Sequence, residues 1–254
     1  MAGTKLKSAK RGRKASGTGQ SQADRAYVEI RDSILKGTLA VGVALSRRKL
    51  AAELGVSVPP ITEALQRLES EGLVESKPRV GTRVRIPTRQ EVEDRSLLRE
   101  ALEAQAAALF AERATASEKK ELHRLGRRMD QLYAAAEKRP ADRDFLFSVN
   151  TFHMGLHLRI AECARCPPLR DAIEKEQVLI FNWLYDTAVQ RRKLGSNFHS
   201  TLTAALTTGS PAGAQTAMRR HIQRGLSEVL AGLDRIGKPG EAWRVKTPRE
   251  VSGS

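Results

Sequence analysis

Hydrophobic residues recur every three or four positions along most of this chain, which is the spacing of amphipathic helices. In the first third, this pattern predicts a helix over residues 27–35 that ends at Gly37. It also predicts a short helix over residues 47–54 and, after a break at Gly55, another over residues 58–71. Two helices joined by a tight turn that contains glycine are typical of a helix-turn-helix motif.

The segments LVES and TRVRI follow these helices and alternate apolar with polar residues, as strands do. They flank the turn sequence KPRVG, so we expect a β-hairpin. Three helices followed by a hairpin predict a winged helix-turn-helix domain over residues 26–87.

The rest of the chain carries helical periodicity alone, and several start signals mark where helices begin. Thr88 with Glu91, and Thr115 with Glu118, match the capping-box pattern, and Ser210 precedes a proline at the first helical position. The expected helices span about residues 88–114, 115–138, 142–164, 168–192, 196–208 and 211–233. We therefore predict an all-α bundle over residues 88–235, a loose tail over 236–254, and a mainly α fold overall.

Composition narrows the class of protein. The 254 residues include 44 Lys and Arg against 29 Asp and Glu, a formal net charge of +15 that suggests a polyanionic partner. No uncharged apolar run reaches the roughly 18 residues of a membrane helix, so we expect no membrane partner. With only two cysteines and no secretory signal pattern, we expect a cytoplasmic protein.

The first 25 residues are rich in Gly, Ser and Thr and lack apolar periodicity, so we expect a disordered arm. Its charged residues are Lys5, Lys7, Lys10, Arg11, Arg13, Lys14 and Arg25 against Asp24, a net charge of +6. Such an arm either binds phosphates without sequence preference or simply keeps the chain in solution.

The sequence LAAELGVSVPPITEALQRLESEGLVESKPRVGTRVRIP resembles the DNA-binding domain of GntR-type bacterial transcription regulators. The resemblance covers about 60 residues and several motifs. It implies a homodimer that binds a double-stranded DNA operator, because one recognition helix covers only a few base pairs. A winged helix that contacts only protein is the alternative.

Candidate DNA-binding residues follow from the motif, in which the second helix reads the major groove. They are Ser57, Val58, Thr62 and Gln66 on the outer face of that helix, Arg79 and Gly81 at the wing tip, and Arg47, Arg48 and Lys49 near phosphates. The family usually has arginine where this chain has Val58 and Thr62. Since bidentate arginine–guanine contacts are the commonest specific readout, we expect a different operator, with Val58 near thymine methyl groups and Gln66 near adenine.

All five histidines fall in the predicted bundle, and four of them lie at positions that suit a shared site. His153 and His157 are four residues apart, so they share one helix face, while His199 and His221 belong to the last two helices. By themselves these residues fit either a metal site or buried, hydrogen-bonded histidines. The Cys163-x-x-Cys166 pair has redox or zinc spacing but no second pair, so two small helix-end residues are the simpler interpretation.

The segments LREALEAQAAALFAERAT, HLRIAECARCPPL and FHSTLTAALTTGSPAGAQTAMRRHI resemble the FCD effector domain of the FadR-like subfamily. This resemblance implies a divalent metal held by His157, His199 and His221, with His153 where the family has Asp or Asn. Four imidazoles favour Zn or Ni over Mg or Ca. Arg99 occupies the position of a family arginine, and we expect its guanidinium group to grip a small carboxylate effector; the alternative is a surface salt bridge to Glu103.

These observations predict a ligand-responsive transcriptional regulator, a repressor that its effector releases from DNA. The alternative is a helical metal-dependent hydrolase that carries a DNA-binding tether. A hydrolase also needs a general base beside its metal, and the chain lacks a helical H-E-x-x-H motif. The sequence does not identify the effector.

Overall fold

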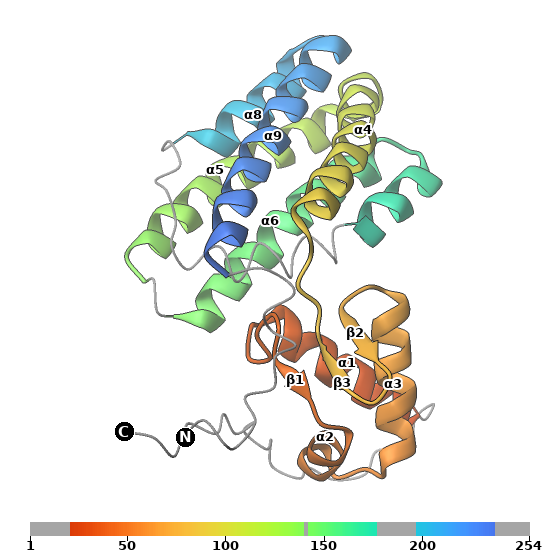
Figure 1. Cartoon of the computed structure of the whole chain (residues 1–254). Helices are drawn as coiled ribbons and strands as arrows, with labels where there is room; N and C mark the ends of the chain where they lie inside the picture. The colour runs from red at the N-terminus through yellow and green to blue at the C-terminus, as the bar shows by residue number, and fades with distance from the viewer. Residues whose placement is uncertain (1–20, 140–141, 177–196, 237–254) are drawn as a thin grey trace, which may run out of the picture. The chain divides into compact units, whose positions relative to one another are not determined.

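A computed structural model describes residues 21–139, 142–176 and 197–236 (Figure 1). The chain divides into two compact units, of which the described parts are residues 21–86 and 87–236. Among the helices described, none combines the length and the apolar character needed to cross a membrane.

The first unit is a winged helix-turn-helix domain, as predicted. Its elements are α1 (Gln22–Leu35), β1 (Ala44–Leu45), α2 (Arg47–Leu54), α3 (Val58–Ser70), β2 (Val74–Lys77) and β3 (Gly81–Val84). The strands form an antiparallel sheet in the order β1-β3-β2. The sequence pattern did not predict β1, which pairs with β3 through only two residues.

The start of α1 also corrects an expectation. The helix begins at Gln22, inside the segment that we assigned to the basic arm, because Ser21 and Asp24 form a capping box. Ala23 and Ala26 are buried in this first turn and a half, but alanines are too small to stand out in a periodicity pattern. Arg67 of α3 pairs with Asp24 at 2.6 Å and ties this end of α1 to the domain. Residues 1–20 of the predicted arm lie outside the described residues.

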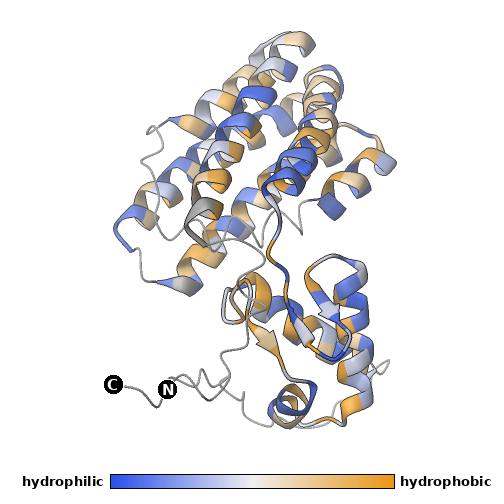
Figure 2. Cartoon of the chain, in the orientation of Figure 1, coloured by the Kyte–Doolittle hydropathy of each residue, from blue (hydrophilic) through white to orange (hydrophobic). Residues whose placement is uncertain are grey.

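The core of this unit is the contact between α1 and α3. Ile30 and Ile34 pack with Ile61, Leu65 and Leu68, all of which are at most 2% exposed. Burying each of these side chains contributes about 1.5–3 kcal/mol, before the entropy of ordering the chain is subtracted. The polar residues of α3 therefore face outward, and Figure 2 shows hydrophilic and hydrophobic residues mixed along the helix as this arrangement requires.

The second unit is a bundle of helices, as predicted. Its elements are α4 (Arg89–Arg113), α5 (Ala116–Glu137), α6 (Arg143–Cys163), a helical stretch over 167–176, α8 (Phe198–Thr208) and α9 (Pro211–Ile236). The capping boxes at Thr88 and Thr115 are present. The part of the expected helix 168–192 beyond residue 176 lies outside the described residues.

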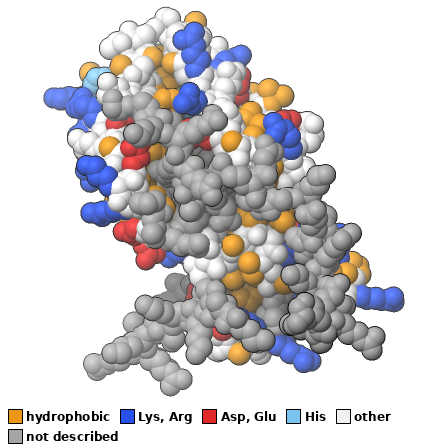
Figure 3. Space-filling view, turned by 60° about the vertical axis from the view of Figure 1, so that its left-hand side comes forward, with side chains coloured by type: hydrophobic (Ala, Val, Ile, Leu, Met, Phe, Trp, Pro, Cys, Tyr) orange, Lys and Arg blue, Asp and Glu red, His pale blue; other side chains and the backbone are white. Residues whose placement is uncertain are grey.

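The packing of the bundle determines which helices can share a site. Phe110 of α4, Met129 of α5 and Leu156 of α6 belong to one buried cluster with Leu206 of α8 and Met218 of α9. Helix α4 packs along α9 and against α6, and α5 packs against both α6 and α8. Inward-facing side chains of α4, α6, α8 and α9 can therefore meet in the interior. On the face that Figure 3 shows, Lys and Arg side chains of this unit are spread over separate places.

Two glycines can show whether the turn of the helix-turn-helix needs glycine for its backbone conformation or for lack of space. Gly55 ends α2 with a φ of +65°, and no atom lies within 4 Å of where its Cβ would be. Gly155 lies in α6, is exposed and has equally open space. We expect Gly55→Ala to lower stability by about 1–2 kcal/mol, because a left-handed conformation strains an L side chain. Gly155→Ala should instead raise stability by about 0.5–1 kcal/mol, because alanine loses less entropy in a helix. Urea unfolding followed by circular dichroism measures both; the same effect at both positions would contradict this explanation.

Candidate functional site

The outer face of α3 carries the residues expected to read bases. Ser57 precedes the helix with no side-chain cap hydrogen bond, and Ser57, Val58 and Gln66 are exposed. Thr62 is partly buried, and its hydroxyl donates to the carbonyl of Val58 at 3.2 Å. The hydroxyl proton of Thr62 is thus engaged within the helix, whereas the amide of Gln66 points into solvent.

Cationic residues gather around the wing. Arg79 is exposed at the turn between β2 and β3 with a φ of 63°, and Gly81 follows with a φ of 129°. Arg47, the first residue of α2, donates to the Thr82 hydroxyl at 3.1 Å. These four residues line one concavity of about 550 Å³, which can accommodate a phosphate group between two guanidinium groups. Arg48 and Lys49 are exposed at the start of α2.

The interior of the bundle contains a cluster of histidines. The Nε2 atoms of His153 and His157 lie 3.1 Å apart, and the Nε2 atom of His221 lies 3.3 Å from the first and 3.2 Å from the second. All three residues are at most 9% exposed. A tetrahedral ion with nitrogen ligands at 2.0–2.1 Å keeps them about 3.3 Å apart, so this triangle has the size of a metal-ligand set. Among the described residues, these three form a group able to hold one ion.

Two buried carboxylates orient the rings. Glu103 of α4 accepts a hydrogen bond from Nδ1 of His157, and Asp130 of α5 accepts one from Nδ1 of His199 at 3.0 Å. A neutral imidazole that donates through Nδ1 keeps its lone pair on Nε2. Such carboxylate–histidine pairs are the usual second contacts of metal-binding histidines. His199 is 1% exposed, and its Nε2 atom has no hydrogen-bond partner.

His199, the predicted fourth ligand, is not part of the group whose ligand atoms all lie within 4.8 Å of one another. Its ring is nevertheless close to the group, with its centroid 5.1 Å from that of His153 and 5.4 Å from that of His221. Two aromatic rings that the sequence analysis did not predict pack against these histidines. Tyr133 stacks on His199 with ring centroids 4.9 Å apart, and Phe198 stacks on His221 with ring centroids 4.8 Å apart.

Burial disfavours protonation of three of the four clustered histidines. Burial, followed by the neighbouring histidines, lowers the pKa values of His153 and His221 well below 6.5. Burial also lowers the pKa of His199, although Asp130 partly opposes it. Burial alone would raise the pKa of Glu103, but Arg99 and His157 outweigh it and lower that pKa to about 2. Neutral imidazoles beside ionised carboxylates are the protonation states that a metal requires.

Arg99 adds a cation to this interior. Its Nε atom donates to Glu103 at 2.5 Å, so the expected ion pair exists, but it is buried and not on the surface. The Nη2 atom of Arg99 is also buried and has no hydrogen-bond partner. Because an unsatisfied buried donor costs about 1–3 kcal/mol, an acceptor from a ligand would relieve it.

Cys163 is the last residue of α6 and Cys166 follows the helix, and neither belongs to the histidine group. Cys163 is buried and Cys166 is partly buried, and both are free thiols. Burial raises the pKa of the Cys163 thiol, which makes it a poor nucleophile.

The chain matches two described families. Residues 22–84 match "Bacterial regulatory proteins, gntR family", and residues 96–224 match the FCD domain. The "HTH-type transcriptional repressor RspR" of Escherichia coli K12 is 24% identical over 85% of this chain and 91% of that protein. An uncharacterized HTH-type regulator of Streptomyces ambofaciens is 43% identical, over 30% of this chain and 33% of that protein.

Solved structures support the same fold. The structure of E. coli McbR/YncC superimposes with a TM-score of 0.64 and 24% identity, over 83% of this chain and 98% of that one. The families and relatives are transcription regulators and not enzymes, so the hydrolase alternative has no support. The chain is a member of the GntR family of DNA-binding transcriptional regulators, of the FadR-like type with a C-terminal FCD domain.

Proposed function

We propose that this regulator holds one divalent metal ion, Zn or Ni, on His153, His157 and His221, with His199 as a fourth ligand. The observation that carries the proposal is the triangle of buried Nε2 atoms with sides of 3.1–3.3 Å. The unpartnered Nε2 atom of His199 adds a nearby donor of the same kind. Four neutral imidazoles suit a borderline ion better than Mg or Ca.

The bound ion, acting as a Lewis acid, would hold an oxygen of a small carboxylate effector. Arg99 would donate to the same carboxylate from its unpartnered Nη2 atom, while the Nε atom of Arg99 stays paired with Glu103. Charge supports an anionic effector. Arg99, Glu103 and Asp130 together carry one net negative charge, and a divalent ion bound by neutral imidazoles would reverse this to one net positive charge.

The DNA-binding unit would act as part of a homodimer on a two-fold operator in the cytoplasm, where the chromosome lies. Leu97 and Leu98 of α4 are 68% and 46% exposed, an apolar pair that a second copy of the chain would cover. The effector would release the repressor by binding one dimer arrangement more tightly than the other.

Metal analysis tests the first proposal. Protein purified without chelator should contain about one Zn or Ni per chain, and His157→Ala and His221→Ala should each lose most of it, because each removes one corner of the triangle. His123→Ala, in the same bundle, serves as the control and should keep the metal. If the wild type contains no stoichiometric metal and takes none up on titration, the histidines are structural.

His153→Asp separates the ion from the effector. This variant keeps a metal ligand but adds a negative charge, so we expect it to retain metal and bind carboxylates more weakly. Thermal-shift screening of carboxylate metabolites, with and without metal, provides the measurement. If effector affinity does not change, the charge argument fails even though the metal site stands.

DNA readout should separate into specific and non-specific parts. We expect Gln66→Ala and Thr62→Ala to weaken binding to the specific operator by about 1–3 kcal/mol each and to leave non-specific binding almost unchanged. The loss at Thr62 should be the smaller, because its hydroxyl already donates to Val58.

Deleting residues 1–20 should instead weaken both kinds of binding and flatten the salt dependence, because that segment acts through phosphates. Titrations of operator and random DNA at several salt concentrations measure these effects. If the α3 variants and the deletion weakened binding to operator and random DNA equally, the proposed separation of base readout from phosphate contact would be wrong.

A further inference from the structure

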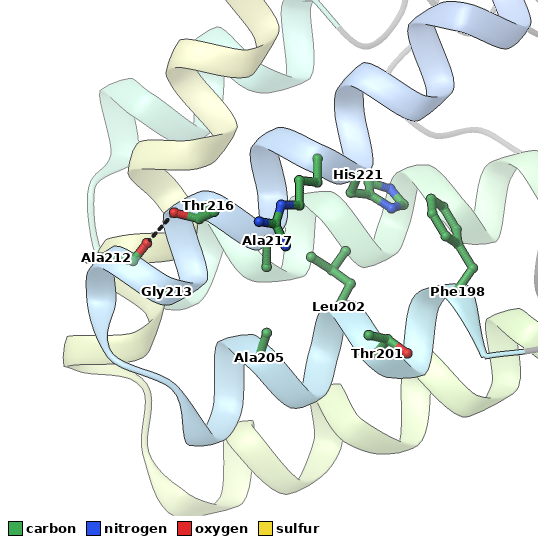
Figure 4. A pocket seen from close by; sticks show the side chains of 10 residues that line it. Phe198, Thr201, Leu202, Ala205, Ala212, Gly213, Thr216, Ala217 and His221 are labelled. Atoms are coloured by element: carbon green, nitrogen blue, oxygen red, sulfur yellow. Dashed lines mark hydrogen bonds between the residues drawn. The ribbon is translucent and has the colours of Figure 1, made fainter.

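A groove of about 590 Å³ runs between α8 and α9 (Figure 4). Its walls are small residues of both helices: Ala205 on α8, and Ala212, Gly213 and Ala217 on α9. Leu202 adds apolar surface. Small residues on two facing helices leave a narrow, mainly apolar slot, and its volume lies in the range typical of small-molecule sites, about 300–1,000 Å³.

One end of the groove has a buried polar atom with nothing to bind. His221 lines this end and is 6% exposed, and its Nδ1 atom has no hydrogen-bond partner. The Nε2 atom of the same ring is the one that faces His153 and His157. Figure 4 shows the Phe198 ring beside His221, and the two rings stack at 4.8 Å. This end therefore offers an aromatic surface and a polar nitrogen together.

The groove also carries one charge. Arg220 lines it, is exposed, and makes no ion pair with any residue that the structure describes. Its neighbour Arg219 points elsewhere and lies 4.0 Å from Glu100 of α4. The hydroxyl of Thr216, another lining residue, donates to its own helix at the carbonyl of Ala212. Arg220 is thus the strongest polar feature available to a ligand in the groove.

We propose that the α8–α9 groove binds a small amphipathic organic anion, an aromatic or short-chain aliphatic carboxylate or sulfonate. Its apolar body lies between the small residues of the two helices, its anionic group pairs with Arg220, and its inner end contacts Phe198 and His221. This site adjoins the proposed effector site but is distinct from it, because His221 is the one lining residue that belongs to the cluster. A ligand here does not coordinate the ion.

Two fluorescent probes that differ in charge test this site on the full chain. 8-Anilinonaphthalene-1-sulfonate has an aromatic body and one negative charge, and N-phenyl-1-naphthylamine has the same body without the charge. We expect Arg220→Ala to weaken binding of the sulfonate about 3- to 10-fold and to change binding of the neutral probe less than about 2-fold. Arg219→Ala, the matched control on the adjacent residue, should change neither.

Filling the groove tests the apolar part. Ala205→Phe should weaken both probes at least about 10-fold, because the ring occupies their space. Thr208→Phe, which adds the same ring to α8 at a residue that does not line the groove, is the control. Should Ala205→Phe fail to fold by circular dichroism, Thr201→Phe at an exposed position of the groove takes its place.

The metal content of every variant should equal that of the wild type, so damage to the histidine cluster would be recognised separately. Unchanged sulfonate binding in the folded groove-filling variants would overturn the proposal. An equal loss in Arg219→Ala and Arg220→Ala would do the same, because the probe would then be following general surface charge.

Discussion

The arrangement of the bundle's interior depends on the partners that its buried imidazole rings find. His153, His157, His199 and His221 come from three helices, and polar rings without partners are costly in a low-dielectric interior. Glu103 on α4 and Asp130 on α5 each accept from one ring, so these hydrogen bonds join α4 to α6 and α5 to α8. Nη2 of Arg99 and Nε2 of His199 are among the buried polar atoms that still lack a hydrogen-bond partner within the described residues. A metal ion and an anion are the two groups that would complete this interior.

The same arrangement gives the cluster a direct covalent connection to the DNA-binding unit. Helix α4, which carries Arg99 and Glu103, begins at Arg89, and the last strand of the wing ends at Val84. A ligand at Arg99 would therefore contact the helix that follows the wing in sequence. To change the affinity for DNA, such a ligand would have to bind two arrangements of the proposed dimer with different affinity.

The helices of the bundle and part of the histidine cluster could be predicted from the sequence, because local sequence patterns determine them. Capping boxes located α4 and α5, and the i, i+4 spacing put His153 and His157 on one face. The missed features depend on tertiary contacts. Asp130 is 69 residues from His199, and no local signal joins them. The burial of the Arg99–Glu103 pair could not be read from its spacing, which is equally typical of a helix surface. The strand β1 exists only because β3 lies beside it.

X-ray absorption spectroscopy of the protein loaded with nickel or zinc tests the central claim most directly, because it counts the atoms around the ion. The account predicts at least three imidazole nitrogens at about 2.0–2.1 Å, with one fewer in His221→Ala. A shell made of oxygen atoms with one imidazole or none would contradict it, because the ion would then lie outside the histidine cluster.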